Sequence, residues 1–264
     1  MLKIDSIFKT FNPGTINENR VLNGFSLHLK EGDFVTIIGG NGAGKSTVLN
    51  SVAGVFPVDY GTITIDGKDV TKLSEYKRAA LIGRVFQDPM TGTAAGMNIE
   101  DNLALSARKG KRRSLRWGIS SKERKEYRSL LSTLGLGLES RLTDKVGLLS
   151  GGQRQALTLL MATLVKPKIL LLDEHTAALD PKTAAKVLTI SDQIVRKHNL
   201  TTMMVTHNMR DAINYGNRLI MMNKGQVILD ISGDEKKSLT VEQLLNKFTE
   251  AAGEEFTSDS AILG

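Results

Sequence analysis

A glycine-rich run near the start of the chain has the residue types of a phosphate-binding loop. It follows the apolar segment 34–38 and fits the pattern G-x-x-x-x-G-K-[ST], with Gly39, Gly40, Asn41, Gly42, Ala43, Gly44, Lys45, Ser46 and Thr47. Glycines let successive backbone N–H groups point at phosphate oxygens, and a following helix adds partial positive charge. Lys45 would reach the outer phosphates and the Ser46 hydroxyl would bind Mg²⁺. The alternative is a flexible glycine-rich turn, and the sequence pattern arises by chance in roughly one chain in a hundred of this size.

Two carboxylates directly follow an apolar run in the second half of the chain. Segment 169–172 has the composition of a buried strand, and Asp173 and Glu174 come next, where open α/β sheets bind ligands. Asp173 suits a second contact to Mg²⁺, and Glu174 suits polarising an attacking water. Alone, the pair would more simply be an acidic turn, because loops are polar. A phosphate loop in the same chain favours the catalytic interpretation.

A second helix start also combines a serine with glycines. Leu149 precedes Ser150, Gly151, Gly152 and Gln153, and a helix-compatible run covers 154–165. A hydroxyl and glycine N–H groups at a helix N-terminus can meet a γ-phosphate. The simpler interpretation is a serine N-cap. With the phosphate role, the chain would have two phosphate-binding helix ends, one more than a single nucleotide site needs.

Three further side chains are weaker candidates. Gln87 follows an apolar pair and could touch Mg²⁺ or the water, and His207 follows the segment 202–206 and could hydrogen-bond a γ-phosphate. Phe11 could stack on a purine base, although an aromatic residue in an edge loop more often serves packing. Each of these assignments depends on the phosphate loop.

The periodicity of the sequence predicts an α/β fold around these residues. Strands are expected at 25–29, 34–38 and 62–65, the last ending in the hairpin turn Asp66-Gly67. Strand 169–172, helix 181–198 and strand 202–206 imply a parallel sheet. Segments 219–222 and 226–230 flank Asn223-Lys224-Gly225 as a closing hairpin.

A helical insert is expected at about 88–150. Asn98 with Asp101 marks a helix start, and Ser129 to Leu138 is leucine-rich at helical spacing. The small, polar tail from Glu250 is expected to be frayed. The whole chain, 1–264, is therefore expected to form one domain.

Composition narrows the class of protein. The 264 residues are 41% hydrophobic and 24% charged, which is ordinary for a folded globular chain. Cysteine is absent, which excludes disulfides, thiolate metal sites and cysteine nucleophiles. No apolar run approaches the ~18 residues of a spanning helix, and the first residues lack the apolar stretch of a secretory signal. The expectation is a soluble chain that neither spans a membrane nor is exported by that route.

The positive charge is concentrated in one stretch. The chain carries +7, whereas Arg108 to Arg128 holds ten basic and two acidic residues, so this stretch is +8 and the remainder is −1. A solvated helical face, a nucleic-acid footprint and a contact with anionic lipid all remain possible explanations. From charge alone, the solvated helical face is the simplest of these explanations.

Taken together, the motifs resemble the ATP-binding subunit of an ABC transporter. The resemblance extends to about residue 235 and has the family's order of motifs: Walker A at 39–47, the Q-loop at Gln87, the signature at 149–153, Walker B at 169–173, the D-loop Ala178-Leu179-Asp180 and the switch histidine His207. It implies a P-loop NTPase core with a mixed sheet, an N-terminal antiparallel β subdomain and a helical insert. It also implies Mg²⁺-dependent hydrolysis of ATP coupled to transport.

The resemblance further implies partners and a location. In this family two subunits pair head to tail, so Ser150 and Gly151 of one chain would close over the nucleotide held by Lys45 of the other, with Asp180 near the shared site. The chain would sit on the cytoplasmic side of the cell membrane, bound to permease subunits. Because the helical insert of such ATPases approaches the membrane subunits, we predict that the basic stretch 108–128 faces the inner membrane surface. One departure is His175, where family members usually carry proline. The sequence around Gln87 and His175 looks like bacterial importer ATPases that work with a lipoprotein receptor, some of them associated with aromatic amino acids.

Three rival functions use parts of the same sequence. An exporter ATPase would use the same motifs. A soluble ATPase of nucleic-acid repair or translation would use the basic stretch, but that stretch has two aromatic residues, Trp117 and Tyr127, too few for a stacking platform. We therefore expect no nucleic-acid partner. A nucleotide-binding regulator without turnover is disfavoured because Glu174 and His207 are both present.

Overall fold

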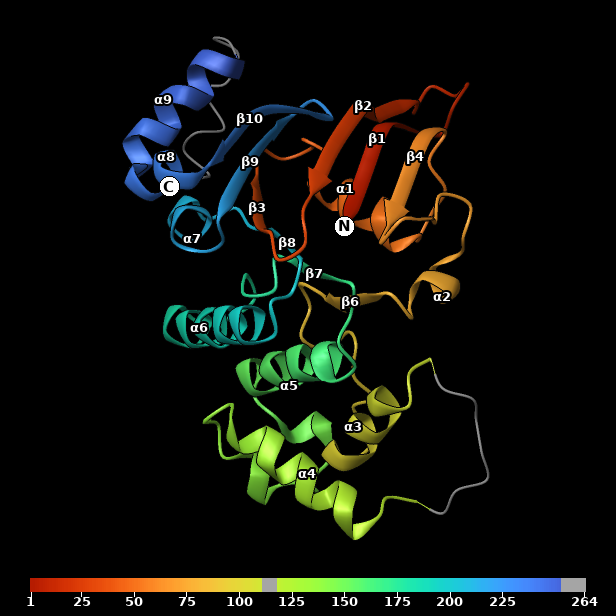
Figure 1. Ribbon diagram of the computed structural model, residues 1–264, viewed down its shortest axis with the longest axis vertical. Helices are drawn as coiled ribbons and strands as arrows, with labels where there is room; N and C mark the ends of the chain where they lie inside the picture. Colours follow the sequence, from red (N-terminus) through yellow and green to blue (C-terminus); the bar gives the residue numbers. More distant parts are fainter. Residues whose placement is uncertain (111–117, 253–264) are drawn as a thin grey trace.

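The computed structural model describes residues 1–110 and 118–252, which form two sheets and a set of helices. Figure 1 shows the sheets in the upper half, with α3 and α4 at the lower end. The helices of the described chain are α1 Lys45–Ala53, α2 Glu75–Arg78, α3 Ile99–Ala107, α4 Ser121–Ser132, α5 Gly151–Leu164, α6 Pro181–His198, α7 Met209–Asn214, α8 Gly233–Ser238 and α9 Val241–Ala252, with 3-10 turns at Leu138–Ser140 and Val146–Leu148. No helix of this described part is long and apolar enough to cross a membrane.

The smaller sheet is antiparallel and is built from the N-terminal part of the chain. Its order is β2-β1-β4-β5, and its strands are β1 Leu2–Phe11, β2 Asn19–Leu29, β4 Tyr60–Ile65 and β5 Lys68–Asp69. The predicted hairpin turn between β4 and β5 is confirmed, because Asp66 and Gly67 both have positive φ, 52° and 76°. This left-handed pair is what a two-residue hairpin requires.

The larger sheet has six strands in the order β10-β9-β3-β8-β7-β6. The five from β9 to β6 pair in parallel, and β10 joins antiparallel through the predicted hairpin. Its strands are β3 Phe34–Ile38, β6 Ile82–Val85, β7 Ile169–Asp173, β8 Thr202–Val205, β9 Arg218–Asn223 and β10 Gln226–Ser232. The mixed sheet and the N-terminal antiparallel sheet are the predicted α/β fold class.

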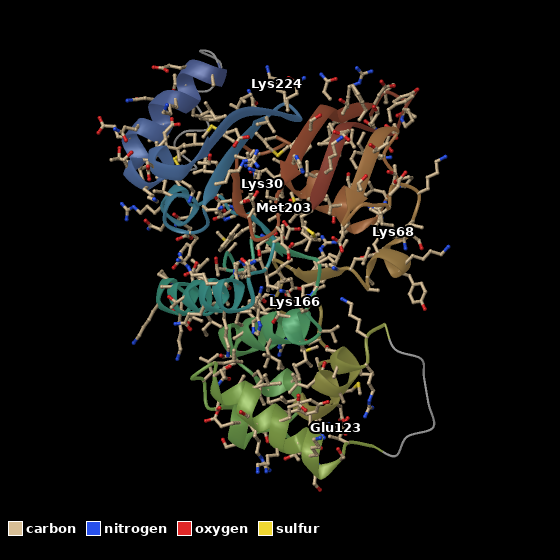
Figure 2. The ribbon with its side chains drawn as sticks, in the orientation of Figure 1. Lys30, Lys68, Glu123, Lys166, Met203 and Lys224 are labelled. Atoms are coloured by element: carbon tan, nitrogen blue, oxygen red, sulfur yellow. The ribbon has the colours of Figure 1, made fainter. Side chains whose placement is uncertain are left out.

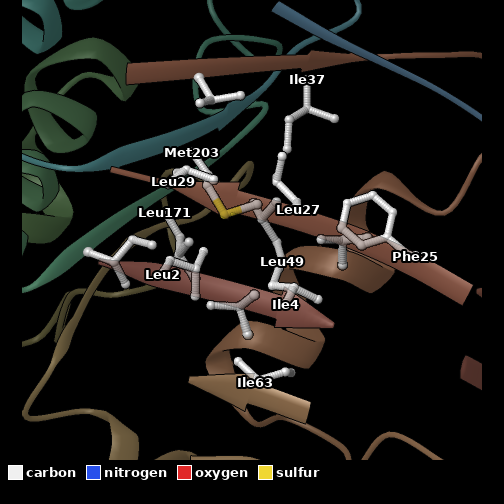
Figure 3. Close-up of a cluster of buried hydrophobic side chains, with 14 of the residues drawn as sticks. Leu2, Ile4, Phe25, Leu27, Leu29, Ile37, Leu49, Ile63, Leu171 and Met203 are labelled. Atoms are coloured by element: carbon white, nitrogen blue, oxygen red, sulfur yellow. The ribbon is translucent and has the colours of Figure 1, made fainter. Parts of the chain in front are cut away.

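Alternate side chains of the central strands enter different hydrophobic cores. Val35 and Ile37 of β3 join the core shared with α1 and the small sheet, whereas Phe34 packs with α5 and α6 on the other face. Figure 3 shows the first core, with Ile37, Leu171 and Met203 facing side chains of β1, β2 and α1. Because both faces are covered, β3 and β8 are buried along their whole length.

Residues 88–150 contain α3, α4 and the two 3-10 turns. Capping boxes begin both helices, at Asn98 with Asp101 and at Ser120 with Glu123, which Figure 2 labels near the lower end. The predicted helix over 129–138 is wrong in its second half, because α4 ends at Ser132 and the chain turns through Gly135 and Gly137. Both glycines have positive φ, 61° and 71°, which an α-helix cannot accommodate. The leucines of this segment still enter the core of the helical region.

The basic stretch is less uniform than its sequence suggests. Lys109 turns inward and its Nζ donates to the Ile82 carbonyl at 2.7 Å, while Arg124 forms a salt bridge with the buried carboxylate of Glu100 at 2.8 Å. Arg108 lies 3.5 Å from Glu123. Lys122, Lys125 and Arg128 are exposed on α4. The remaining cations, Lys111, Arg112, Arg113 and Arg116, and Trp117 lie outside the described residues.

The C-terminal helix extends past the predicted start of the frayed tail. Helix α9 includes Glu250 and ends at Ala252, so the expectation is wrong for these first residues. Leu244 and Phe248 are the reason, since both are buried in a core with residues of β9, β10 and α7 and hold the helix in place. Residues 253–264 lie outside the described part of the chain.

Candidate functional site

The glycine-rich loop lies between β3 and α1 and is closely packed. Gly39, Gly42 and Gly44 have positive φ, 152°, 76° and 95°. A Cβ on Gly44 would lie 3.0 Å from the Val21 carbonyl oxygen, and one on Gly39 would overlap the Met222 carbonyl. The loop therefore needs glycine at these places both for its backbone path and for its contacts with β2 and β9.

Lys45 lies inside this loop. Its Nζ donates to the carbonyl oxygens of Gly39 and Gly40 at 2.8 and 3.1 Å, and the side chain is largely buried. Burial lowers the pKa of Lys45, an effect opposed by the charges of Glu174 and Asp173. A buried cation at the positive end of a helix, with neutral acceptors, strongly favours an anion beside it. The loop is therefore suited to phosphate.

Ser46 and Asp173 come from different elements and meet at the carboxyl edge of the large sheet. The Ser46 Oγ donates to Asp173 Oδ1 at 3.5 Å, and Arg84 Nη2 lies 3.5 Å from Oδ2. Burial raises the pKa of Asp173, while the charge of Arg84 lowers it. The described residues contain no cluster of three or more His, Asp or Glu side chains that could hold a metal alone. One carboxylate and one hydroxyl fit Mg²⁺, which takes few protein ligands when phosphates supply the rest.

Glu174 and His207 face each other at the ends of two neighbouring strands. The Glu174 Oε1 and His207 Nδ1 atoms are 3.1 Å apart, with His207 about half exposed. Strands β7 and β8 pair in parallel, with Asp173 opposite Val205, so the residues after them are adjacent. The sequence placed both residues at strand ends. Their contact follows from the strand order.

Gln87 is exposed just after β6. The preceding residue is tied down by two contacts that the sequence did not predict: Gln155 of α5 donates to the Phe86 carbonyl at 2.8 Å, and the Arg84 guanidinium lies 4.5 Å from the Phe86 ring centroid. Arg84 also donates to Asn50 Oδ1 at 2.6 Å. No local motif marks these contacts, because most of them join residues far apart in the chain.

Ser150 begins α5 as its N-cap. Its Oγ accepts from the Gln153 N–H, and Gln153 Oε1 accepts from the Ser150 N–H. The Gln153 amide also donates to the Leu136 carbonyl at 3.3 Å, so this side chain is used within the chain. Gly152 is buried, and a Cβ there would overlap the methyl group of Thr183 on α6. Ser150 and Gly151 remain exposed.

The two glycine-rich helix starts belong to different parts of the molecule. Helix α1 packs against β2, β7 and β8, whereas α5 packs against α3, α4, α6 and β6. Asp180 caps the start of α6 by accepting from the Thr183 N–H at 3.1 Å, and its hydrogen bonds with Thr183 lower the pKa of Asp180. Phe11 lies edge-on to Phe56, with ring centroids 5.2 Å apart. Phe11 also pairs with Asn19 of β2, and the same strand lies next to Gly44 of the glycine-rich loop.

This fold and this arrangement of loop, carboxylates and second helix start define an ATP-binding cassette. A family profile described as ABC transporter matches residues 22–177, and the chain belongs to this family. It is an ATPase whose hydrolysis is coupled to transport.

Similar proteins agree on the class. The chain is 47% identical over 248 residues to the tyrosine transport ATP-binding protein of Clostridioides difficile strain R20291, covering 94% of this chain and 98% of that protein. It is 34% identical to the spermidine/putrescine import ATP-binding protein PotA of Haemophilus influenzae, covering 89% of this chain and 59% of PotA. Among solved structures, a dimeric post-hydrolysis state of the cassette MJ0796 bound to ADP and Pi has TM-score 0.74 and 30% identity, covering 88% and 98% of the two chains.

Proposed function

We propose that the chain powers an importer of amino acids, with aromatic amino acids such as tyrosine as the substrate class. The observation that carries this proposal is the 47% identity, along nearly the whole of both chains, to a tyrosine transport ATP-binding protein. The more distant PotA is named as an import protein, which supports the same direction. No comparable observation favours the exporter.

In this proposal the P-loop and the ends of β7 and β8 perform hydrolysis. Lys45 and the loop N–H groups bind the β- and γ-phosphates, and Ser46, Asp173 and Gln87 hold Mg²⁺. When bound, Mg²⁺ supplies positive charge that offsets the phosphate charge. Glu174 orients and polarises the attacking water. His207 hydrogen-bonds the γ-phosphate, and its 3.1 Å contact with Glu174 sets the orientation of the ring.

The second helix start acts in a dimer. Ser150 and Gly151 close over the nucleotide of a second copy of the chain, with Asp180 next to the same junction and Phe11 stacking on adenine. The dimeric state of the similar cassette MJ0796 supports this arrangement. So does the exposure of Ser150 and Gly151 at the start of a helix that packs mainly against α3, α4, α6 and β6.

The partners are permease subunits at the cytoplasmic side of the membrane, with a substrate-binding lipoprotein acting through them. Within the described part of residues 108–128, the cations that would contact the membrane are Lys122, Lys125 and Arg128. Arg108, Lys109 and Arg124 already have carboxylate or carbonyl partners. Anionic headgroups attract such cations by about 1 kcal/mol each. A nucleic-acid partner is not part of the proposal.

Reconstitution tests the substrate class and the direction. Tagged chain is purified from membranes with its partners, and the complex is placed in proteoliposomes. We expect tyrosine, phenylalanine or tryptophan to stimulate hydrolysis and labelled tyrosine to move in the import direction, with Glu174→Gln complex as the control without turnover. Stimulation by spermidine instead, or movement in the export direction, would contradict the proposal.

A further inference from the structure

The turn that carries Glu174 has a backbone conformation that its own sequence does not favour. Glu174 has φ 43°, in the left-handed region where a residue with a Cβ is strained. Such a conformation persists only where neighbouring contacts fix it. The Glu174 N–H donates to the Val205 carbonyl at 3.0 Å, and the Ala177 N–H donates to the Glu174 carbonyl at 2.9 Å. These bonds fix the main chain but leave the next side chain, His175, to be explained.

His175 is inserted into the protein interior against α6. Its side chain is 2% exposed, and its Nε2 lies 3.0 Å from the Ser191 Oγ. Ser191 is fully buried and its Oγ donates to the Val187 carbonyl at 2.9 Å. Because a hydroxyl has one proton, His175 must be the donor in the first bond. The imidazole therefore carries its proton on Nε2.

We propose that the His175–Ser191 hydrogen bond positions Glu174 for hydrolysis, an inference that rests on the role of Glu174 proposed above. The bond fastens the residue directly after Glu174 to the middle of α6. Asp180 is the N-cap of the same helix, so the bond ties the turn of Glu174 to the helix that Asp180 caps. Loss of the bond would free the turn to relax from its strained conformation and would move the Glu174 carboxylate relative to His207.

Three variants and a matched control test this role. Ser191→Ala removes the acceptor, His175→Leu removes the donor at similar volume, and His175→Gln keeps a donor. The control is Thr163→Val, because the Thr163 hydroxyl of α5 makes the same type of bond, to the Leu159 carbonyl at 2.9 Å, without a histidine partner. Hydrolysis, ATP affinity and melting temperature are measured for each.

We expect kcat to fall about ten- to hundredfold in Ser191→Ala and His175→Leu, as a small misplacement of a catalytic group does. ATP affinity should stay within about twofold, His175→Gln should recover most of kcat, and Thr163→Val should keep it. In a Glu174→Gln background, His175→Leu should lower the residual single-turnover rate by less than about twofold, because no carboxylate is left to position.

Failure of this inference is distinguishable from failure of the proposed function. If Glu174→Gln abolishes hydrolysis but folded Ser191→Ala keeps kcat within about twofold of wild type, the positioning role is wrong and the proposed function stands. Equal losses of kcat and melting temperature in Ser191→Ala and Thr163→Val would also overturn it. If Glu174→Gln hydrolyses ATP like wild type, the proposed role of Glu174 fails first. Should His175→Leu not fold, the Ser191→Ala result decides.

Discussion

The N-termini of α1 and α5 both have glycines beside or within the first turn, yet their chemistry differs. Helix α1 has Gly44 as N-cap, no side-chain cap and the buried cation Lys45 at its first position. Helix α5 is closed by the reciprocal pair Ser150 and Gln153 and has no acidic residue in its first turn. The N-terminus of α1 therefore has an excess of positive charge and no side chain that caps its N–H groups. At the N-terminus of α5, the hydrogen bonds between Ser150 and Gln153 already pair part of the backbone N–H groups.

In the proposed dimer, this difference predicts unequal roles for the two helix ends. The α1 end can bind phosphate charge in an isolated chain. The α5 end has only a hydroxyl proton and exposed N–H groups to offer, so its contribution is small until another chain presents a nucleotide to it. Substitutions at the two ends should therefore differ in the size of their effects.

The largest effect is expected for Lys45→Ala. Hydrogen bonds to charged groups contribute about 1.5–3 kcal/mol, so ATP affinity should fall up to about a hundredfold. Ser150→Ala should leave the affinity of the isolated chain within about twofold. Titration calorimetry on both variants checks this. Similar losses in the two variants would mean that one chain holds both ends against its own nucleotide.

Gly152→Ala should destabilise the α5 end through packing. The new Cβ would overlap the Thr183 methyl group, and such overpacking lowers the free energy of unfolding by about 2 kcal/mol. Adding Thr183→Ser, which removes the methyl group, should restore most of the loss. Gly96→Ala is the control, because no atom lies within 4 Å of the place that its Cβ would take and its φ is not positive. Urea unfolding that finds Gly152→Ala as stable as wild type would contradict the packing role.

A third helix end, the C-terminus of α7, predicts that stability depends on pH. Lys236 is buried, and its Nζ donates to the carbonyls of Ile213, Tyr215 and Gly216 at the end of α7. Burial lowers the pKa of Lys236 from 10.5 to about 8. Above pH 8 the folded chain binds fewer protons than the unfolded chain, so the contribution of Lys236 to stability rises by about 1.4 kcal/mol between pH 7 and 9. The difference in unfolding free energy between wild type and Lys236→Met should show this rise, and a flat difference would contradict it.

The smallest effect is expected for the cap itself. Ser150→Ala removes the acceptor for the Gln153 N–H, which lowers the free energy of unfolding by about 1 kcal/mol. Thermal or urea unfolding measures it, with Ser150→Asn as a control that keeps a capping oxygen. If Ser150→Asn lost as much unfolding free energy as Ser150→Ala, the capping hydrogen bond of Ser150 would not be the source of the stability.

The sequence predicted the elements better than the contacts between them. The bounds of β3 and α6 agree with the predicted 34–38 and 181–198, because β-branched runs, an Asp cap and a first-turn proline are local signals. The helix over 129–138 failed because two glycines override the leucine spacing. The contact of Glu174 with His207 needed the strand order, and Arg84 with Asp173, Gln155 with Phe86 and His175 with Ser191 join distant segments. No local pattern could have predicted these pairs.

The central claim, that each site is shared between two chains, is tested most directly by mixing two defective proteins. Lys45→Ala disables the α1 end and Ser150→Arg fills the α5 end with a bulky cation, so either homodimer has two defective sites. A mixed dimer has one site with intact Lys45 and intact Ser150. Mixing should restore up to about a quarter of wild-type hydrolysis by subunit statistics, or one trapped nucleotide per mixed dimer if turnover needs both sites. If crosslinking confirms subunit exchange and neither hydrolysis nor trapping returns, the shared site and the role of Ser150 are wrong.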